Sequence, residues 1–151
     1  MKPSKGFSLI EVLIAIVVIG IVAAVAGLNL HAYTLNRNLK SAAREIASDF
    51  TLCKQKAASE SKTYQIVFNS PSAGSYTIQT TISTDPTVVK SVSSFGKDIT
   101  IDSETFGGTV NFNSRGTITP LGNVNLRNSR NSTATITVTT MGRANVTFNI
   151  Q

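Results

Sequence analysis

The sequence has few of the residues that build covalent cross-links, metal centres or catalytic sites. It contains one cysteine, Cys53, and one histidine, His31. A single cysteine excludes an intramolecular disulfide, and these two residues alone cannot supply the usual ligand set of a zinc site. A glycine-rich phosphate loop and the usual catalytic constellations are also missing. The sequence therefore predicts a protein that is not an enzyme and that needs no metal or other cofactor.

Proline and acidic residues are missing from long stretches. No proline occurs between Pro3 and Pro71, so none interrupts a helix in this region. The last acidic residue is Glu104, although the chain has 151 residues and a formal net charge of +6. A basic surface is therefore expected on the C-terminal part. Its arginines are Arg115, Arg127, Arg130 and Arg143.

The N-terminal region, in contrast, contains a long apolar run. From Val12 to Leu28 there are seventeen consecutive uncharged residues, of which eleven are Val, Ile or Leu. A helix over residues 7–30 would be about 36 Å long, which is enough to cross a bilayer with some tilt. Lys2 and Lys5 precede the run, so its N-terminal side should lie in the cytoplasm. The sequence predicts a single-pass membrane protein with an extracytoplasmic head.

Two simpler interpretations of the apolar run are a secretory signal peptide and a plain membrane anchor. Ala24-Val25-Ala26 has the small-residue pattern of a signal peptidase site, with cleavage before Gly27. A plain anchor would explain the length of the run. Neither interpretation explains the carboxylate of Glu11 within the apolar region or the abrupt Gly6-Phe7 junction.

Both features are explained by the segment Gly6-Phe7-Ser8-Leu9-Ile10-Glu11-Val12-Leu13-Ile14, which resembles the class III signal of type IV pilins and pseudopilins. The resemblance implies that a prepilin peptidase cuts after Gly6, that the new amine of Phe7 is N-methylated, and that Glu11 is needed for assembly. An intramembrane carboxylate is costly unless it gains a partner. The amine of Phe7 in a neighbouring subunit would be such a partner. The alternative is that Glu11 lies unpartnered at the headgroup interface.

The helical pattern continues beyond the apolar run. Apolar residues follow in steps of three and four, which places them on one face of a helix. One helix is predicted from about Phe7 to about Ser59, with Cys53 as a buried, unreactive thiol on its apolar stripe. His31 is expected to be an interfacial side chain. The stripe consists of Leu35, Leu39, Ala42, Ile46, Phe50, Cys53 and Ala57.

Short β patterns fill the rest of the chain. A turn is expected at residues 70–74, and Met141-Gly142-Arg143 should join the last two strands as a terminal hairpin. The predicted fold class is α+β, a long N-terminal helix packed on antiparallel β-sheets. The expected strands are 64–68, 76–82, 88–93, 99–101, 110–112, 124–126, 134–140 and 144–150.

The predicted organisation has three parts. Residues 1–6 are the leader peptide, residues 7–30 form the transmembrane and filament-core segment, and residues 31–151 form the extracytoplasmic head. The head comprises an amphipathic helix over 31–60 and a β-region over 63–151.

The C-terminal part adds a second resemblance. The runs Val110 to Gly116, Val124 to Leu126 and Ile136 to Arg143 resemble the C-terminal region of H-type pseudopilins and of FimT- or FimU-like minor pilins. The chain lacks the C-terminal disulfide of major pilins and the acidic calcium site of major pseudopilins, which favours a minor subunit. The resemblance implies a structural subunit of a type IV pilus or of a type II secretion pseudopilus. Its partners would be the prepilin peptidase, other pilin or pseudopilin subunits and the inner membrane, before it joins the filament in the periplasm or at the cell surface.

An alternative function is weak, non-specific DNA binding in DNA uptake. DNA-binding members of the FimT-like group carry Gly-Arg-x-Arg near the C-terminus, whereas this chain has Gly142-Arg143-Ala144-Asn145. The candidates are the four C-terminal arginines, which loops at one edge of the head would gather.

Three acidic residues form a further candidate site. Asp98, Asp102 and Glu104 would share one face if residues 98–104 are a strand. This arrangement is consistent with either a calcium site or a solvated acidic edge.

Overall fold

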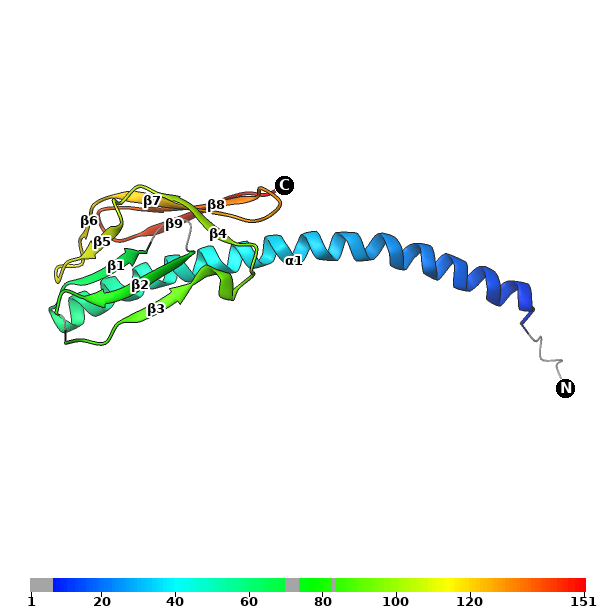
Figure 1. The fold of residues 1–151 in the computed structure, drawn as a ribbon, viewed down its shortest axis with the longest axis horizontal. Helices are drawn as coiled ribbons and strands as arrows, with labels where there is room; N and C mark the ends of the chain where they lie inside the picture. Colours follow the sequence, from blue (N-terminus) through cyan, green and yellow to red (C-terminus); the bar gives the residue numbers. More distant parts are fainter. Residues whose placement is uncertain (1–6, 70–73, 83) are drawn as a thin grey trace. The chain divides into compact units, whose positions relative to one another are not determined.

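The structure is a computed structural model that describes residues 7–69, 74–82 and 84–151, except for the side chains of residues 25–29. The predicted leader, residues 1–6, lies outside the described residues. Contacts divide the chain into two compact units, the second of which is Leu35–Gln151. Helix α1, Leu9–Glu60, passes through both units (Figure 1). The predicted long helix is therefore confirmed, with its start two residues later and its end one residue later than expected.

The apolar stripe of α1 is buried within the second unit. Six of its seven predicted positions, from Leu39 to Ala57, have at most 1% of their surface exposed, and Leu35 is half-buried. Cys53 is a free, buried cysteine, as predicted. The spacing of apolar residues thus identified correctly the face of the helix that forms the core.

Two antiparallel sheets pack with α1 in the second unit, which confirms the α+β fold class (Figure 1). The order of the first sheet is β3-β2-β1-β5-β6, and that of the second is β4-β7-β8-β9. The strands of the first sheet are β1 Tyr64–Phe68, β2 Ser75–Thr80, β3 Val88–Ser91, β5 Thr109–Phe112 and β6 Ile118–Thr119. Those of the second are β4 Thr100–Glu104, β7 Gly122–Arg127, β8 Thr133–Val138 and β9 Ala144–Asn149.

Some strand boundaries differ from the expected ones because side chains take over backbone hydrogen bonds. β2 ends at Thr80, two residues before the expected Ile82, because the Thr80 hydroxyl donates to the carbonyl of Ile82 and accepts from its N–H. β3 ends at Ser91, whose hydroxyl accepts from the N–H of Ser93 and caps the short 3₁₀ helix η2, Val92–Ser94. β6 was not predicted at all. The expected turn at residues 70–74 lies mostly outside the described residues.

Phe50 of α1 lies at the point where the helix meets both sheets. Its ring centroid is 5.8 Å from that of Phe112 in β5 and 6.1 Å from that of Phe106, which follows β4. Val124 of β7 and Ile136 of β8 are fully buried in the same core. A single core therefore joins the second half of α1 to both sheets. The sheets in turn position the loops of the head.

Candidate functional site

The first turn of α1 contains the carboxylate that the sequence singled out. The carbonyl of Ser8 accepts hydrogen bonds from the N–H groups of Glu11 at 3.0 Å and of Val12 at 3.3 Å. Glu11 is the acidic residue of the first turn, where a negative charge complements the positive end of the helix dipole. Its side chain is exposed. Glu11 therefore favours the helix start and can still contact another molecule.

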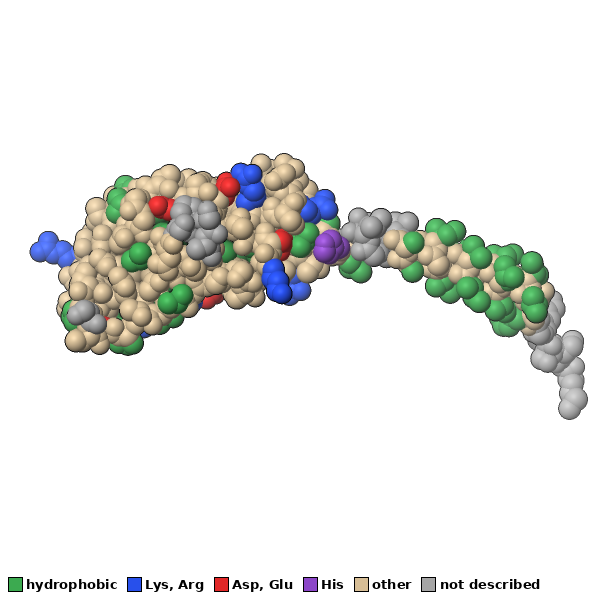
Figure 2. Space-filling model, in the orientation of Figure 1, with side chains coloured by type: hydrophobic (Ala, Val, Ile, Leu, Met, Phe, Trp, Pro, Cys, Tyr) green, Lys and Arg blue, Asp and Glu red, His purple; other side chains and the backbone are tan. Residues whose placement is uncertain are grey.

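The apolar side chains around Glu11 are exposed on all sides of the helix. Phe7 has 82% of its surface exposed and Ile19 has 67%. Figure 2 shows hydrophobic side chains along this part of the chain. A helix that is apolar all round is normally buried in protein or in a membrane. Five of these residues form a shallow apolar depression, namely Phe7, Leu9, Val12, Leu13 and Ile16.

The predicted processing site is only partly described. Gly6 lies outside the described residues, whereas Phe7 is described and highly exposed. Cleavage after Gly6, N-methylation of Phe7 and the assembly role of Glu11 stay predictions. His31 is exposed, and its expected place at a membrane interface is also untested.

Within the described parts of the chain, the structure contains no helix whose length and apolar character suffice to cross a membrane.

A buried polar cluster connects α1 to the first sheet. Asp49 of α1 has 2% of its surface exposed and accepts hydrogen bonds from the Tyr76 hydroxyl at 2.6 Å and from the Lys90 ammonium at 2.7 Å. Lys90 also donates to Glu45, one turn earlier on the helix, at 2.7 Å. Sequence reasoning missed this cluster. The position of Asp49 between the buried Ile46 and Phe50 was the available signal, because a carboxylate there must find partners.

Burial and hydrogen bonding shift the titration of this cluster. Burial, together with the hydrogen bond to Asp49, raises the pKa of Tyr76 well above its usual range. Burial alone would lower the pKa of Lys90, but its hydrogen bonds to Asp49 and Glu45 outweigh that effect and raise it. Burial, reinforced by the charge of Asp49, raises the pKa of Cys53 to about 12. The thiol is thus protonated at neutral pH, which agrees with the predicted unreactive cysteine.

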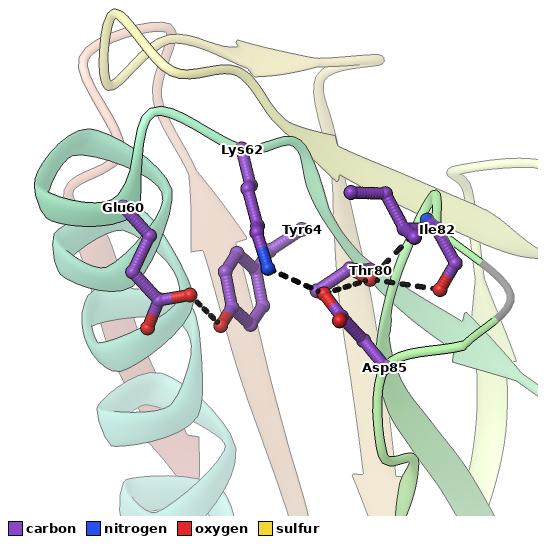
Figure 3. A network of polar contacts seen from close by, with 6 residues as sticks. All are labelled: Glu60, Lys62, Tyr64, Thr80, Ile82 and Asp85. Atoms are coloured by element: carbon purple, nitrogen blue, oxygen red, sulfur yellow. Dashed lines mark hydrogen bonds and ion pairs between the residues drawn. The ribbon is translucent and has the colours of Figure 1, made fainter.

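A second polar network lies at the C-terminal end of α1 (Figure 3). The Tyr64 hydroxyl donates to Glu60 at 2.7 Å, and this bond together with burial raises the pKa of Tyr64 to about 12. Asp85 accepts from Lys62 and Thr80, both at 2.9 Å, and these two bonds lower its pKa. The network holds the end of the helix against β1 and the segment before β3. Lys62 and Asp85 form an ion pair and Glu60 accepts from the Tyr64 hydroxyl, so the network is a structural contact.

The four C-terminal arginines are exposed but do not form one cluster. Arg127 and Arg130 flank the β7–β8 turn, where Asn128 donates to Asn36 near the start of the head at 3.0 Å. Arg127 also forms an ion pair with Asp102 at 2.8 Å.

The other two arginines, Arg115 and Arg143, lie in turns that pack on Lys54. Lys54 donates to the carbonyl of Met141 at 2.6 Å, and its side chain lies against the backbone of Gly116 and Gly142. A Cβ at Gly142, where φ is +74°, would come within 2.5 Å of that side chain, so this turn requires glycine.

The separation of the two pairs follows from the topology of the sheet. Successive hairpin turns of an antiparallel sheet lie at opposite ends of the strands. Asn36 and Lys54, which mark the two ends, are about 27 Å apart along α1. The structure therefore corrects the expectation that loops at one edge gather all four arginines.

The three acidic residues of the candidate calcium site have separate partners. Glu104 accepts from the N–H groups of Phe106 at 2.6 Å and Gly108 at 2.8 Å. Asp102 pairs with Arg127, and β4 is irregular between Ile101 and Ser103, so the strand does not present the expected common face. Among the described residues, no group of three or more histidine, cysteine or acidic side chains is placed to hold a metal.

Comparisons with known proteins give two family matches. Residues 1–27 match the family described as the prokaryotic N-terminal methylation motif. Residues 42–142, about two thirds of the chain, match the family described as type II transport protein GspH. A search of curated proteins found no match.

Two solved structures share the fold. The type IV minor pilin FimU of Pseudomonas aeruginosa has a TM-score of 0.61 at 17% identity, over 76% of this chain and 92% of that one. The minor pseudopilin EpsH from the type 2 secretion system of Vibrio cholerae has a TM-score of 0.55 at 8% identity, over 75% of this chain and 97% of that one. The chain belongs to the GspH family of type II transport proteins, and its N-terminal residues carry the prokaryotic N-terminal methylation motif.

Proposed function

We propose that this protein is a minor subunit of an extracytoplasmic filament, either a type IV pilus or a type II secretion pseudopilus. The observation that carries the proposal is the exposed apolar surface of residues 7–24 with one carboxylate, Glu11, in its first turn. Burying apolar surface yields about 25 cal/mol per Å², so such a helix is stable only where a membrane or other helices cover it. Family membership supports a structural role and not an enzymatic one.

The proposed life cycle has two stages. The segment of residues 7–30 first holds the chain in the inner membrane, with the head outside the cytoplasm. A prepilin peptidase then cuts after Gly6, and the amine of Phe7 is methylated. The match to the N-terminal methylation motif over residues 1–27 supports this processing.

Glu11 has a defined part in the second stage. The carboxylate pairs with the cationic amine of Phe7 in a neighbouring subunit, which removes the cost of an unpaired charge in an apolar environment. Assembly thus depends on cleavage, because the amine does not exist in the precursor.

Substitutions of Glu11 test this proposal in cells. We expect Glu11→Gln to be processed and retained in the membrane fraction but lost from sheared filaments, since the shape is kept and the charge is removed. Glu11→Asp keeps the charge and is the matched control, which should retain most of the incorporation. Equal incorporation of Glu11→Gln and wild type would show that the carboxylate does not pair. A mature N-terminus at Gly27 would establish the signal-peptide interpretation and remove the filament proposal.

A second candidate function is weak DNA binding. It is favoured by the exposure of Arg115, Arg130 and Arg143, for which the described residues provide no ion pair. If three or four phosphates are neutralised, log K should fall against log salt with a slope of about −3 to −4. Mobility shifts of the full chain in detergent would measure this slope for the wild type and for variants at each end of the head. Arg115→Gln and Arg143→Gln change one end, and Arg130→Gln changes the other. If all variants bind like wild type, the arginines do not bind DNA.

A further inference from the structure

The two sheets have four outer strands, β3 and β6 in the first sheet and β4 and β9 in the second. An outer strand carries backbone N–H and C=O groups that can pair with another chain. Proteins usually block such edges with short strands, lysine, proline or bulges.

Three of these four edges are blocked. β6 has only two residues and is followed by Pro120. β4 is irregular between Ile101 and Ser103. β3 has four residues, one of which is Lys90.

β9 is different, because it has six residues and contains no charged residue and no proline. Its register with β8 is unbroken from Thr133↔Asn149 to Val138↔Ala144. It is thus the longest regular edge among the described strands that are outermost in a sheet.

The direction of the backbone groups of β9 follows from the hairpin. Thr139 donates to the carbonyl of Arg143 at 3.0 Å, so Arg143 and every second residue after it bond to β8. The N–H and C=O groups of the residues between them therefore point to the open edge. These residues are Ala144, Val146 and Phe148.

The surroundings of this edge are basic. The Lys40 ammonium lies 5.9 Å from the centroid of the Phe148 ring, Lys54 bonds to Met141, and Arg143 directly precedes the strand. The acidic residues of α1 in this region, Glu45 and Asp49, bond instead to Lys90 of the first sheet. No acidic residue follows Glu104 in the sequence, so neither β8 nor β9 balances this charge.

We propose that the open edge of β9 binds an extended, acidic segment of a partner protein, which adds a fifth strand to the four-stranded sheet. The backbone groups of the edge supply the hydrogen bonds, and Lys40, Lys54 and Arg143 select negative side chains. A second copy of this chain does not fit as the occupant, because pairing two β9 edges would bring basic residues against basic residues. The inference goes beyond the filament role and does not depend on assembly.

Peptides test the two parts of the proposal separately. The full chain in detergent micelles is titrated against a fluorescent eight-residue peptide in which Glu alternates with Val, and saturable binding is expected. N-methylation of every second backbone amide removes hydrogen bonds but no charge, and should weaken binding at least about tenfold. Replacing Glu by Lys should weaken it by a similar factor. Equal binding of the N-methylated peptide would overturn strand addition.

A pair of variants tests the site on the protein. Val146→Pro removes an N–H that points to the open edge and leaves the bonds to β8 in place, so it should bind the Glu peptide at least about tenfold more weakly. Val146→Ala keeps that N–H, removes more of the side chain, and should bind within about twofold of wild type. Thermal unfolding verifies that both variants are folded. Wild-type affinity in a folded Val146→Pro variant would overturn the proposal and leave the proposed filament function untouched.

Discussion

The two halves of helix α1 use similar residues but have opposite surroundings. In the first half, Val17 and Ile21 have 52% and 62% of their surfaces exposed. In the second half, Leu39 and Ile46 have 0% and 1% exposed, because two sheets of the same chain cover them. Aliphatic side chains of comparable helix propensity occur in both halves, so propensity does not explain the difference. The head of the same chain covers the second half, whereas the apolar side chains of the first half stay exposed.

Removing the largest side chain of the covered half tests this contrast most strongly. Phe50 is fully buried against Phe106 and Phe112, so Phe50→Ala should lower the free energy of unfolding of the head by about 3–5 kcal/mol. Val17→Ala is the control in the exposed half and should leave that free energy unchanged. Urea unfolding followed by tyrosine circular dichroism measures both. A comparable loss in the two variants would show that the first half also packs on the head.

Substitutions in the polar cluster of Asp49 test whether charged contacts also stabilise the covered half. Asp49→Ala leaves the Tyr76 hydroxyl without its acceptor and Lys90 with only Glu45, so a loss of about 2 kcal/mol is expected. Glu45→Gln is the matched control, because the Glu45 side chain is 40% exposed and an exposed ion pair contributes about 0–1 kcal/mol. Chemical unfolding at pH 7 compares the variants. Equal losses in the two variants would mean that the buried contacts of Asp49 stabilise the head no more than the exposed ion pair of Glu45 does.

Alkaline pH should weaken the covered half through Cys53. The pKa of this thiol is raised from 9.0 to about 12 in the folded state, so unfolded chains lose the proton first as pH rises. Stability is therefore fully present below pH 9 and is lost progressively between pH 9 and pH 12, by about 1 kcal/mol at pH 10. Tyr64 and Tyr76, whose pKa values are also raised, act in the same direction.

Unfolding of wild type and Cys53→Ala at pH 8 and pH 10 measures the contribution of the thiol. The variant lacks the thiol and should lose less stability between the two pH values. An identical loss in both proteins would assign the alkaline effect to the tyrosines alone.

The smallest effect is expected at the surface of the second sheet. Arg127 and Asp102 form an ion pair at 2.8 Å, but their side chains are 45% and 40% exposed. Arg127→Gln should therefore change the free energy of unfolding by less than about 1 kcal/mol, and less still in high salt. Asp102→Asn removes the other partner and should have an effect of the same size. A loss above 2 kcal/mol in either variant would mean that this pair is shielded from solvent.

The sequence predicted those parts of the fold that depend on local periodicity. The step of three and four residues from Leu39 to Ala57 identified the buried face of α1, and alternation identified β1 and the terminal hairpin. It did not identify β6, because a strand of two residues has no period. Nor did it predict the cluster of Asp49 with Lys90, whose members are 41 residues apart and meet only after β3 is in place.

The candidate site divides in the same way. The carboxylate of Glu11 and the apolar surface around it are local features, and the structure places both in the first turns of α1. The distribution of the arginines depends on which ends of the strands the turns occupy. That is a property of sheet topology, so local sequence patterns could not separate Arg130 from Arg143.

The last strand also has a mechanical consequence for the head. β9 runs alongside α1, with the Met141 turn bonded to Lys54 at one end and Gln151 accepting a hydrogen bond from Asn36 at the other. A pull along the helix axis therefore acts parallel to the line between these two contacts and loads both hydrogen bonds together. A pull across the axis would open them one at a time. The head is built to resist sliding along its helix better than peeling away from it.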